Sequence, residues 1–181
     1  MGISQTEIDA TQEHFGFLRP EPIEKDWYVV QAIRAIQGVN AAPFRLIFAG
    51  GTCLARAHRL VDRMSEDVDF KVIAEPQAPT SKSGRKAALS ALKHKVCEAL
   101  QAEGFTIDPA ADIRARDGNT YILFQLDYTD RQDQVAVLRP KIQVELNFTV
   151  LQTATETKPV QSLIAQAHGT PAEIPSIACT S

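Results

Sequence analysis

A short apolar segment that ends at two glycines places the strongest constraint on how this chain folds. Phe44–Ala49 is rich in strand-forming residues and stops at Gly50-Gly51, as a buried strand does when it enters a tight turn. Thr52–Leu60 then predicts a short helix. A strand, a glycine turn and a helix in this order bring backbone N–H groups and the positive end of a helix to one point, where phosphate oxygens fit. An isolated glycine pair is more often only a tight turn, so the phosphate hypothesis needs a second signal.

The second signal is a pair of carboxylates. Residues 67–72 alternate polar and apolar side chains with a period of two, which predicts a strand on which Asp67 and Asp69 point to the same side. Two neighbouring aspartates repel each other and lose hydration unless a cation compensates them. Mg²⁺ prefers such oxygen ligands and leaves positions open for substrate phosphates. We therefore favour a Mg²⁺ site, with Mn²⁺ as a second candidate, over a strand that simply faces solvent.

A later segment offers a third carboxylate. Residues 141–148 are rich in β-branched and aromatic residues and predict a strand on which Lys141, Gln143 and Glu145 share one face. Glu145 would complete a two-metal site with the aspartate pair. Lys141 would contact a phosphate, although a solvated lysine at the start of a strand is an equal alternative.

Other patterns predict the remaining elements. Apolar residues at helical spacing predict helices at residues 23–37 and 85–103, and further patterns predict a strand at 121–126 after a hairpin turn at 117–119. Polar, turn-forming sequences predict loops at 74–84 and in the tail after Val150. We therefore expect an α/β (α+β) fold, with a small mixed sheet and helices on one side. Residues 1–38 would be an N-terminal helical segment, 44–150 the core and 151–181 a tail.

Composition excludes several classes of protein. The sequence contains no apolar stretch long enough to span a bilayer and no secretory signal pattern, so we expect a cytoplasmic protein without membrane contact. The net charge of −3 does not indicate a nucleic-acid-binding field. Cys53, Cys97 and Cys179 are scattered, which predicts reduced structural thiols. The histidines are too dispersed for a recognisable metal-binding spacing; they are His14, His58, His94 and His168.

Two stretches carry a resemblance to a known family. The order Phe48–Leu54 and then Arg63–Phe70 resembles the AbiEii/AbiGii toxin family of nucleotidyltransferases, within the DNA polymerase beta-like superfamily. Glu24–Val30 and Leu138–Glu145 are also similar to that family, so the resemblance spans most of the chain. Members continue beyond a segment like Ile174–Ser181 into a helical domain that this sequence lacks, so we expect a catalytic core.

The resemblance implies roles for individual residues. The positions that would line the nucleotide phosphates are Gly50, Gly51 and Thr52, and those that would bind Mg²⁺ are Asp67, Asp69 and Glu145. Arg63 and Ser65 would flank the site, and Lys141 would contact the nucleotide. The sequence departs from the family where Gln143 stands in place of a basic residue, and where the third acid is Glu145 rather than an aspartate.

The implied activity is Mg²⁺-dependent transfer of a nucleoside monophosphate from an NTP to a hydroxyl of tRNA or of a protein. The biological role would be that of the toxin in a toxin–antitoxin or phage-defence pair, restrained by a separately encoded antitoxin. Two alternatives stay open. One is a non-catalytic nucleotide-binding or interaction module with the same fold, and the other is a nucleotidyltransferase antitoxin that modifies a partner toxin.

Overall fold

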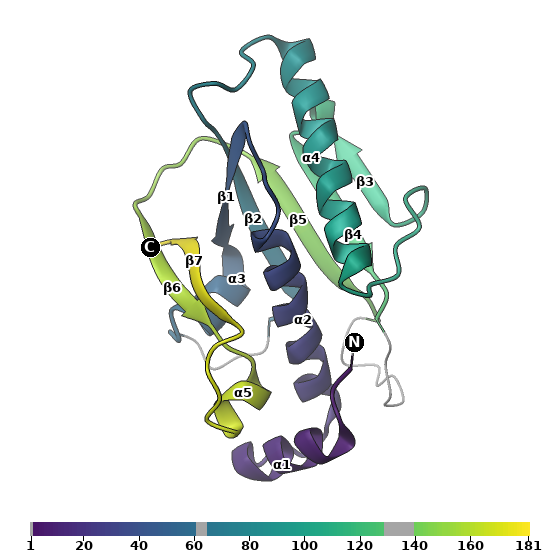
Figure 1. The fold of residues 1–181 in the computed structure, drawn as a ribbon, viewed down its shortest axis with the longest axis vertical. Helices are drawn as coiled ribbons and strands as arrows, with labels where there is room; N and C mark the ends of the chain where they lie inside the picture. Colours follow the sequence, from purple (N-terminus) through teal and green to yellow (C-terminus); the bar gives the residue numbers. More distant parts are fainter. Residues whose placement is uncertain (1, 61–64, 129–139) are drawn as a thin grey trace.

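A computed structural model describes residues 2–60, 65–128 and 140–181. In these residues the chain forms a mixed sheet of seven strands in the order β3-β4-β5-β2-β1-β7-β6 (Figure 1). The strands are β1 (Phe44–Ala49), β2 (Asp67–Ala74), β3 (Ile113–Arg116), β4 (Tyr121–Leu126), β5 (Ile142–Phe148), β6 (Thr155–Val160) and β7 (Ile174–Thr180). β2 runs antiparallel to β1 and parallel to β5. The predicted α/β fold with a mixed sheet is confirmed.

The helices have bounds set largely by local capping. They are α1 (Gln5–Phe15), α2 (Glu21–Gln37), α3 (Gly50–Thr52), α4 (Lys82–Ala102) and α5 (Leu163–Ala167), with a π-helical turn at Cys53–Ala57 and a 3-10 turn at Asp117–Asn119. Ser81 caps α4 by accepting a hydrogen bond from the backbone N–H of Gly84, so this helix begins at Lys82 rather than at the predicted Arg85. The predicted helix at 52–60 is instead one α-helical turn that continues as the π-helical turn.

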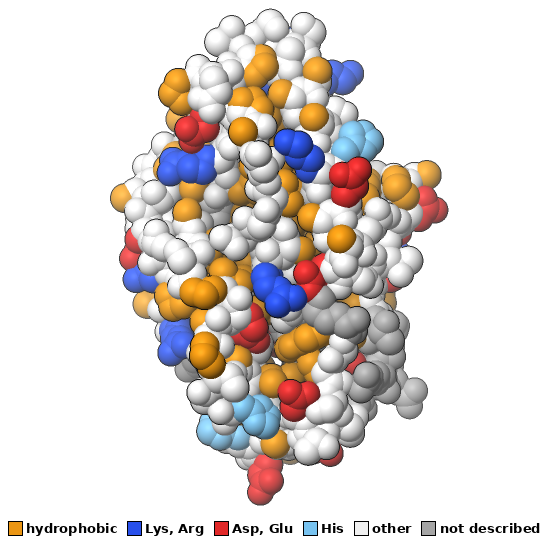
Figure 2. Space-filling model, viewed as in Figure 1, with side chains coloured by type: hydrophobic (Ala, Val, Ile, Leu, Met, Phe, Trp, Pro, Cys, Tyr) orange, Lys and Arg blue, Asp and Glu red, His pale blue; other side chains and the backbone are white. Residues whose placement is uncertain are grey.

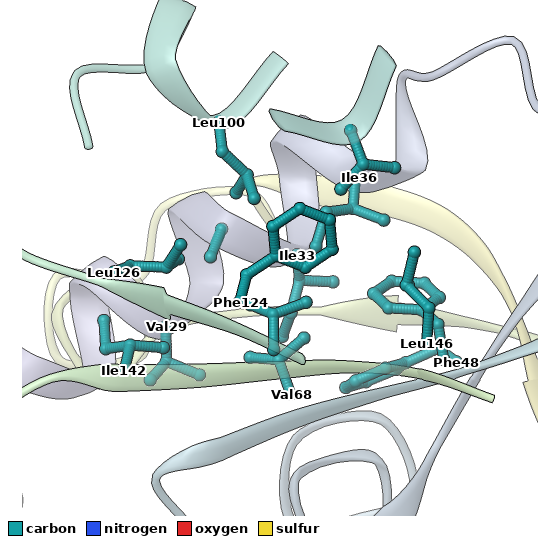
Figure 3. Packing of buried hydrophobic residues seen from close by; sticks show 14 of the residues in the cluster. Val29, Ile33, Ile36, Phe48, Val68, Leu100, Phe124, Leu126, Ile142 and Leu146 are labelled. Atoms are coloured by element: carbon teal, nitrogen blue, oxygen red, sulfur yellow. The ribbon is translucent and has the colours of Figure 1, made fainter. Parts of the chain in front are cut away.

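The hydrophobic core lies between one face of the sheet and helices α2 and α4 (Figure 1). Val68 of β2 and Leu146 of β5 are among the sheet residues that meet Ile33 of α2 and Leu100 of α4 (Figure 3). These side chains are almost completely buried. Because side chains alternate along a strand, the residues between them point to the opposite face of the sheet. The carboxylates of β2 and β5 therefore lie on the face that α2 and α4 do not cover.

The tail after Val150 differs from the sequence prediction. It was predicted as a polar loop, but it forms β6, α5 and β7. β7 adds to the sheet beside β1 in parallel, through the pairing of Phe48 with Cys179. α5 supplies Leu163 and Ile164 to a second apolar cluster with α1 and α2. The tail is thus part of the folded unit.

The surface over α2 and α4 shows no single basic patch. Lys and Arg side chains are scattered among acidic and apolar ones on the face seen in Figure 2. This distribution fits a solvated helix face better than an RNA-binding stripe. Across the described ranges, no helix combines the length and apolar character needed to cross a membrane.

Candidate active site

The register of the sheet brings the three predicted acidic residues together. Asp69 on β2 is paired with Glu145 on β5, and Asp67 precedes Asp69 by two residues on the same face. Residues at one level of adjacent strands place their side chains side by side. The same Asp69 is paired on its other side with Ala49, the last residue of β1 before the glycine turn. The acidic cluster, defined as Asp67, Asp69 and Glu145, therefore lies where the glycine turn begins.

The electrostatics of the acidic cluster show the cost of bringing these groups together. Burial, together with the negative charges of Glu145 and Asp67, raises the pKa of Asp69 from 3.8 to about 6. A buried carboxylate beside two others is stabilised when a cation neutralises part of the charge. The donor chemistry therefore fits a hard divalent cation such as Mg²⁺, although among the described residues the three carboxylates do not all lie within 4.8 Å of one another and would have to move closer to share one ion.

The glycine turn is built directly against this cluster. Gly50 has a φ of +76°, and a Cβ atom at this position would lie 1.9 Å from Oδ2 of Asp69. Only glycine fits, since a side chain would meet both strain and a clash. The buried hydroxyl of Thr52 donates a hydrogen bond to the backbone carbonyl of Asp67, which fixes the turn onto the start of β2. The hydroxyl of Thr52 is thus used within the protein, and its contribution to a phosphate site would be its backbone N–H.

Tyr121 belongs to the same site although the sequence did not point to it. Its hydroxyl hydrogen-bonds with Glu145, and burial together with this contact raises the pKa of Tyr121. Tyr121 lies on β4, opposite Asn147, so its ring reaches diagonally across to Glu145. Arg116 on β3 pairs with Tyr121 and lies 6.0 Å from the centre of its ring. A tyrosine in a strand gave no signal of this contact, because the contact depends on the β4–β5 register.

Helix α2 supports the site from beneath the sheet. Lys25 of α2 is fully buried and forms an ion pair with Glu66, the residue before Asp67. Asp26 pairs with Arg56 at 2.6 Å and accepts a hydrogen bond from the backbone N–H of Leu163 at 2.7 Å. These buried contacts join α2, the segment after the glycine turn and α5. They fix the chain after the glycine turn and just before β2.

The sequence also predicted that Lys141, Ser65 and Arg63 belong to the site. The Nζ atom of Lys141 lies 2.7 Å from Asp112 and 2.9 Å from Asp127, and these contacts raise the pKa of Lys141. Lys141 therefore ties β5 to neighbouring segments. Ser65 is half-buried just before β2, and Arg63 lies outside the described residues.

Comparisons with known proteins identify the family of this chain and a protein of similar fold. The family model for "Nucleotidyl transferase AbiEii toxin, Type IV TA system" matches residues 40–181, which include the glycine turn and the whole acidic cluster. The fold is similar to that of MenT4, a nucleotidyltransferase toxin from Mycobacterium tuberculosis H37Rv, with a TM-score of 0.55 and 18% identity. The similarity covers 98% of this chain and 55% of MenT4, so the chain spans little more than half the length of that toxin. A search of curated proteins finds no significant match.

Proposed function

Because this chain belongs to the AbiEii family of nucleotidyl transferase toxins, we propose that it transfers a nucleoside monophosphate from an NTP to a hydroxyl acceptor. The observation that carries this proposal is the contact between the glycine turn and the acidic cluster. The glycine turn lies against Asp69, whose pKa is raised by burial and by the charges of Glu145 and Asp67, and a cation beside phosphate oxygens would offset that charge. A triphosphate with its cation needs both features at one place.

The proposed cation is Mg²⁺, with Mn²⁺ as the alternative, and its ligands would be Asp67, Asp69 and Glu145. When bound, it supplies positive charge that stabilises the charge developing on the phosphate oxygens. Tyr121 holds Glu145 in orientation through its hydroxyl. Thr52 holds the turn against β2, so the turn and the carboxylates keep a fixed relation. Catalysis of this kind depends on positioning and charge more than on a protein nucleophile.

The proposed reaction forms one bond and breaks one. The oxygen of the acceptor hydroxyl bonds to the α-phosphorus of the NTP, and the bond from that phosphorus to the bridging oxygen breaks. Pyrophosphate leaves with the electron pair, and the hydroxyl proton passes to a carboxylate or to water. Gly50, Gly51 and Thr52 would face the phosphates with their backbone N–H groups, which lack acceptors within the first turn of a helix.

A basic side chain for the phosphates is proposed on β2. Lys71 follows Asp69 by two residues and shares its face of the sheet. Lys141 was predicted for this role, but Asp112 and Asp127 already compensate its charge. We therefore assign the phosphate contact to Lys71 and a bracing role to Lys141, with Arg63 and Ser65 as flanking residues.

The acceptor is proposed to be tRNA or a protein hydroxyl, which would place the reaction in the cytoplasm. The family description supports a toxin role and a cognate antitoxin as partner. Phage defence is the corresponding biological setting. A second candidate is a nucleotide-binding module with the same fold and no turnover.

The experiment that tests the function is a labelling assay. The chain is incubated with each α-labelled NTP, Mg²⁺ and either total tRNA or a protein extract, and the products are treated with ribonuclease or protease. Label that ribonuclease releases identifies RNA as the acceptor, and label that protease releases identifies protein. Transfer by the wild type and its loss in Asp69→Asn support the enzyme. Equal labelling by both proteins would refute the proposed site, and nucleotide binding without labelling would favour the module.

A further inference from the structure

A cluster of soft metal ligands lies apart from the acidic cluster. Ligand atoms of Cys53, His58 and Cys179 all lie within 4.8 Å of one another. Cys53 begins the π-helical turn, His58 follows its end, and Cys179 comes from β7. Residues this far apart in the sequence showed no metal-binding spacing, and β7 brings them together. We propose that Cys53, His58 and Cys179 form a site for a soft divalent metal ion of the Zn²⁺ class.

The spacing and burial of the three groups suit such an ion. A tetrahedral Zn²⁺ with sulfur and nitrogen ligands separates those atoms by about 3.5–3.8 Å, so the observed cluster needs to contract by only about 1 Å. Cys53 is 1% exposed and Cys179 is 0% exposed. The side chain of His58 is 8% exposed. Three nearly buried ligands form a site closed to bulk solvent, which is typical of structural Zn²⁺.

The hydrogen bond of His58 uses Nε2 and leaves Nδ1 available to bind a metal ion. Its Nε2 atom lies 2.8 Å from the backbone carbonyl oxygen of Thr180. A carbonyl only accepts hydrogen bonds, so Nε2 carries the proton and Nδ1 keeps its lone pair in the neutral ring. A metal-bound histidine commonly donates its other N–H to such a backbone carbonyl. The carbonyl of Thr180 therefore holds the His58 ring in the orientation that a metal-bound histidine would need.

A fourth ligand is close to Nδ1. Oε1 of Glu156 lies 3.7 Å from Nδ1 of His58, and Glu156 also pairs with Lys158 at 2.7 Å. A lone pair that faces a carboxylate is repelled by it unless a cation lies between them. Glu156 on β6 is thus placed to complete the coordination of an ion held by the three other ligands.

The thiols of Cys53 and Cys179 are poorly suited to a redox switch. Burial raises the pKa of Cys53 to about 12, and burial also raises the pKa of Cys179. Such thiols remain protonated and react slowly with oxidants, since the thiolate is the reactive form. A metal ion would displace one proton from each thiol, including the one that Cys179 shares with the backbone carbonyl of Glu156. Metal uptake is therefore expected to release two protons and to strengthen as pH rises.

Metal binding at this site would restrict the position of the glycine turn, because the turn and Cys53 are adjacent in the sequence. Cys53 directly follows Thr52, so a metal bond to Cys179 would fix the end of the glycine turn to β7. The same ion, if Glu156 also binds it, would join β6 to the turn. The proposed ion is thus structural, and it connects the C-terminal strands to the nucleotide-binding segment.

The test uses Co²⁺ and Zn²⁺ with the reduced, metal-free full chain. We expect Co²⁺ to produce the charge-transfer absorption of thiolate ligands and the strong visible bands of a tetrahedral site, and Zn²⁺ to abolish them at one equivalent. Cys179→Ser keeps only Cys53 as a thiolate ligand, so it is expected to lose about half of the thiolate absorption and to weaken Zn²⁺ binding by about 100-fold. Cys97→Ser, which changes a buried cysteine on α4, should bind like the wild type. Asp69→Asn should also retain the bands, because carboxylates of the acidic cluster give no thiolate absorption.

Each result of these titrations either supports or contradicts the proposed metal site. Full thiolate bands in the wild type and Cys97→Ser, with weaker bands in Cys179→Ser, support the site. The wild-type spectrum alone can overturn it, even if Cys179→Ser fails to fold, since a reduced wild type without thiolate bands has no such site. Zn²⁺ binding that Cys179→Ser leaves unchanged would place the ion elsewhere and would also contradict the proposal.

Discussion

At the scale of single residues, Asp69 and Gly50 define the proposed site. The carboxylate of Asp69 occupies the space that a Cβ atom of residue 50 would need, so each residue restricts the other. Asp69 also carries the electrostatic cost of the acidic cluster. A residue that lowers stability in the absence of its ligand is typical of a functional site.

The raised pKa of Asp69 gives a prediction with a defined sign. Its folded-state pKa of about 6 exceeds the ordinary value of 3.8, so the stability that protonation gives is complete below about pH 4 and is lost as pH rises through about 6. Asp69→Asn should therefore raise the free energy of unfolding at neutral pH in chelator-treated buffer. A pKa shift of this size corresponds to about 3 kcal/mol. Solvent screening of the partly exposed carboxylate lowers the expected gain in stability to about 1–2 kcal/mol.

Urea denaturation over a range of pH values measures this effect. The difference between Asp69→Asn and the wild type should disappear below about pH 4, where the wild-type carboxyl is neutral in both states. Saturating Mg²⁺ should stabilise the wild type and not the variant. A variant that is less stable than the wild type at neutral pH without metal would contradict the assigned charge repulsion.

Gly50 gives a second prediction, with a matched control. Gly50→Ala introduces a residue with φ of +76° and a Cβ atom 1.9 Å from Asp69, whereas Gly169→Ala introduces one with φ of +62° and no neighbour within 4 Å. The control should lose about 1 kcal/mol from backbone strain. Gly50→Ala should lose about 1–2 kcal/mol more from overpacking. Equal losses in thermal or urea unfolding would show that Asp69 does not lie against the turn.

At the scale of elements, helix α2 and strand β2 fix the site through buried ion pairs. Lys25 and Asp26 of α2 contact Glu66 and Arg56, which both lie between the glycine turn and Asp67. Burial raises the pKa of Asp26 in spite of the charge of Arg56, so this carboxylate is itself costly to keep ionised. Removal of the Asp26 carboxylate charge is still expected to lower the free energy of unfolding, because the nearly buried Arg56 would lose its counter-ion.

Asp26→Asn tests the contribution of this pair. We expect a loss of about 3 kcal/mol in unfolding free energy, since a buried pair is costly to break from one side. Glu103→Gln is the control, because Glu103 pairs with Arg34, whose side chain is 44% exposed, and it should lose less than about 1 kcal/mol. Similar losses in both variants would mean that the Asp26–Arg56 pair has no special role.

The elements also show what the sequence could predict. The period-two pattern of β2 and the apolar run of β1 are local signals, so Asp67 and Asp69 could be placed on one face before the structure was known. The segment Thr155–Val160 is rich in polar residues and contains a proline, as suits a strand at the edge of a sheet, and it was mistaken for a loop. Long-range pairing decides the remaining contacts. The Tyr121–Glu145 contact and the cluster of Cys53, His58 and Cys179 depend on such pairing and gave no local signal.

At the scale of the whole molecule, the C-terminal strands complete the folded unit. β7 covers the edge of β1, and α5 packs in the apolar cluster with α1 and α2. Without these elements, the strand that leads into the glycine turn would have an open edge. The segment that was predicted as a tail therefore supports the nucleotide-binding turn.

A chain shortened to end at Val150 tests this support. We expect the loss of a cooperative thermal transition and aggregation, because β1 would expose its backbone and the core would lose Ile174, Ile177 and Cys179. A chain that lacks only Ser181 is the control and should unfold like the parent. A cooperative transition of unchanged midpoint in the shortened chain would show that β6, α5 and β7 are dispensable.

The proposed function requires that the acidic cluster and the glycine turn together bind an NTP with its cation. Calorimetry with a non-hydrolysable NTP analogue tests it most directly, since binding does not require an acceptor or a further domain. We predict Mg²⁺-dependent binding at one site in the wild type and in Gly169→Ala, and a loss of about 100-fold or more in Asp69→Asn and Gly50→Ala. Unchanged binding in Asp69→Asn, or wild-type binding that is independent of Mg²⁺, would contradict the account.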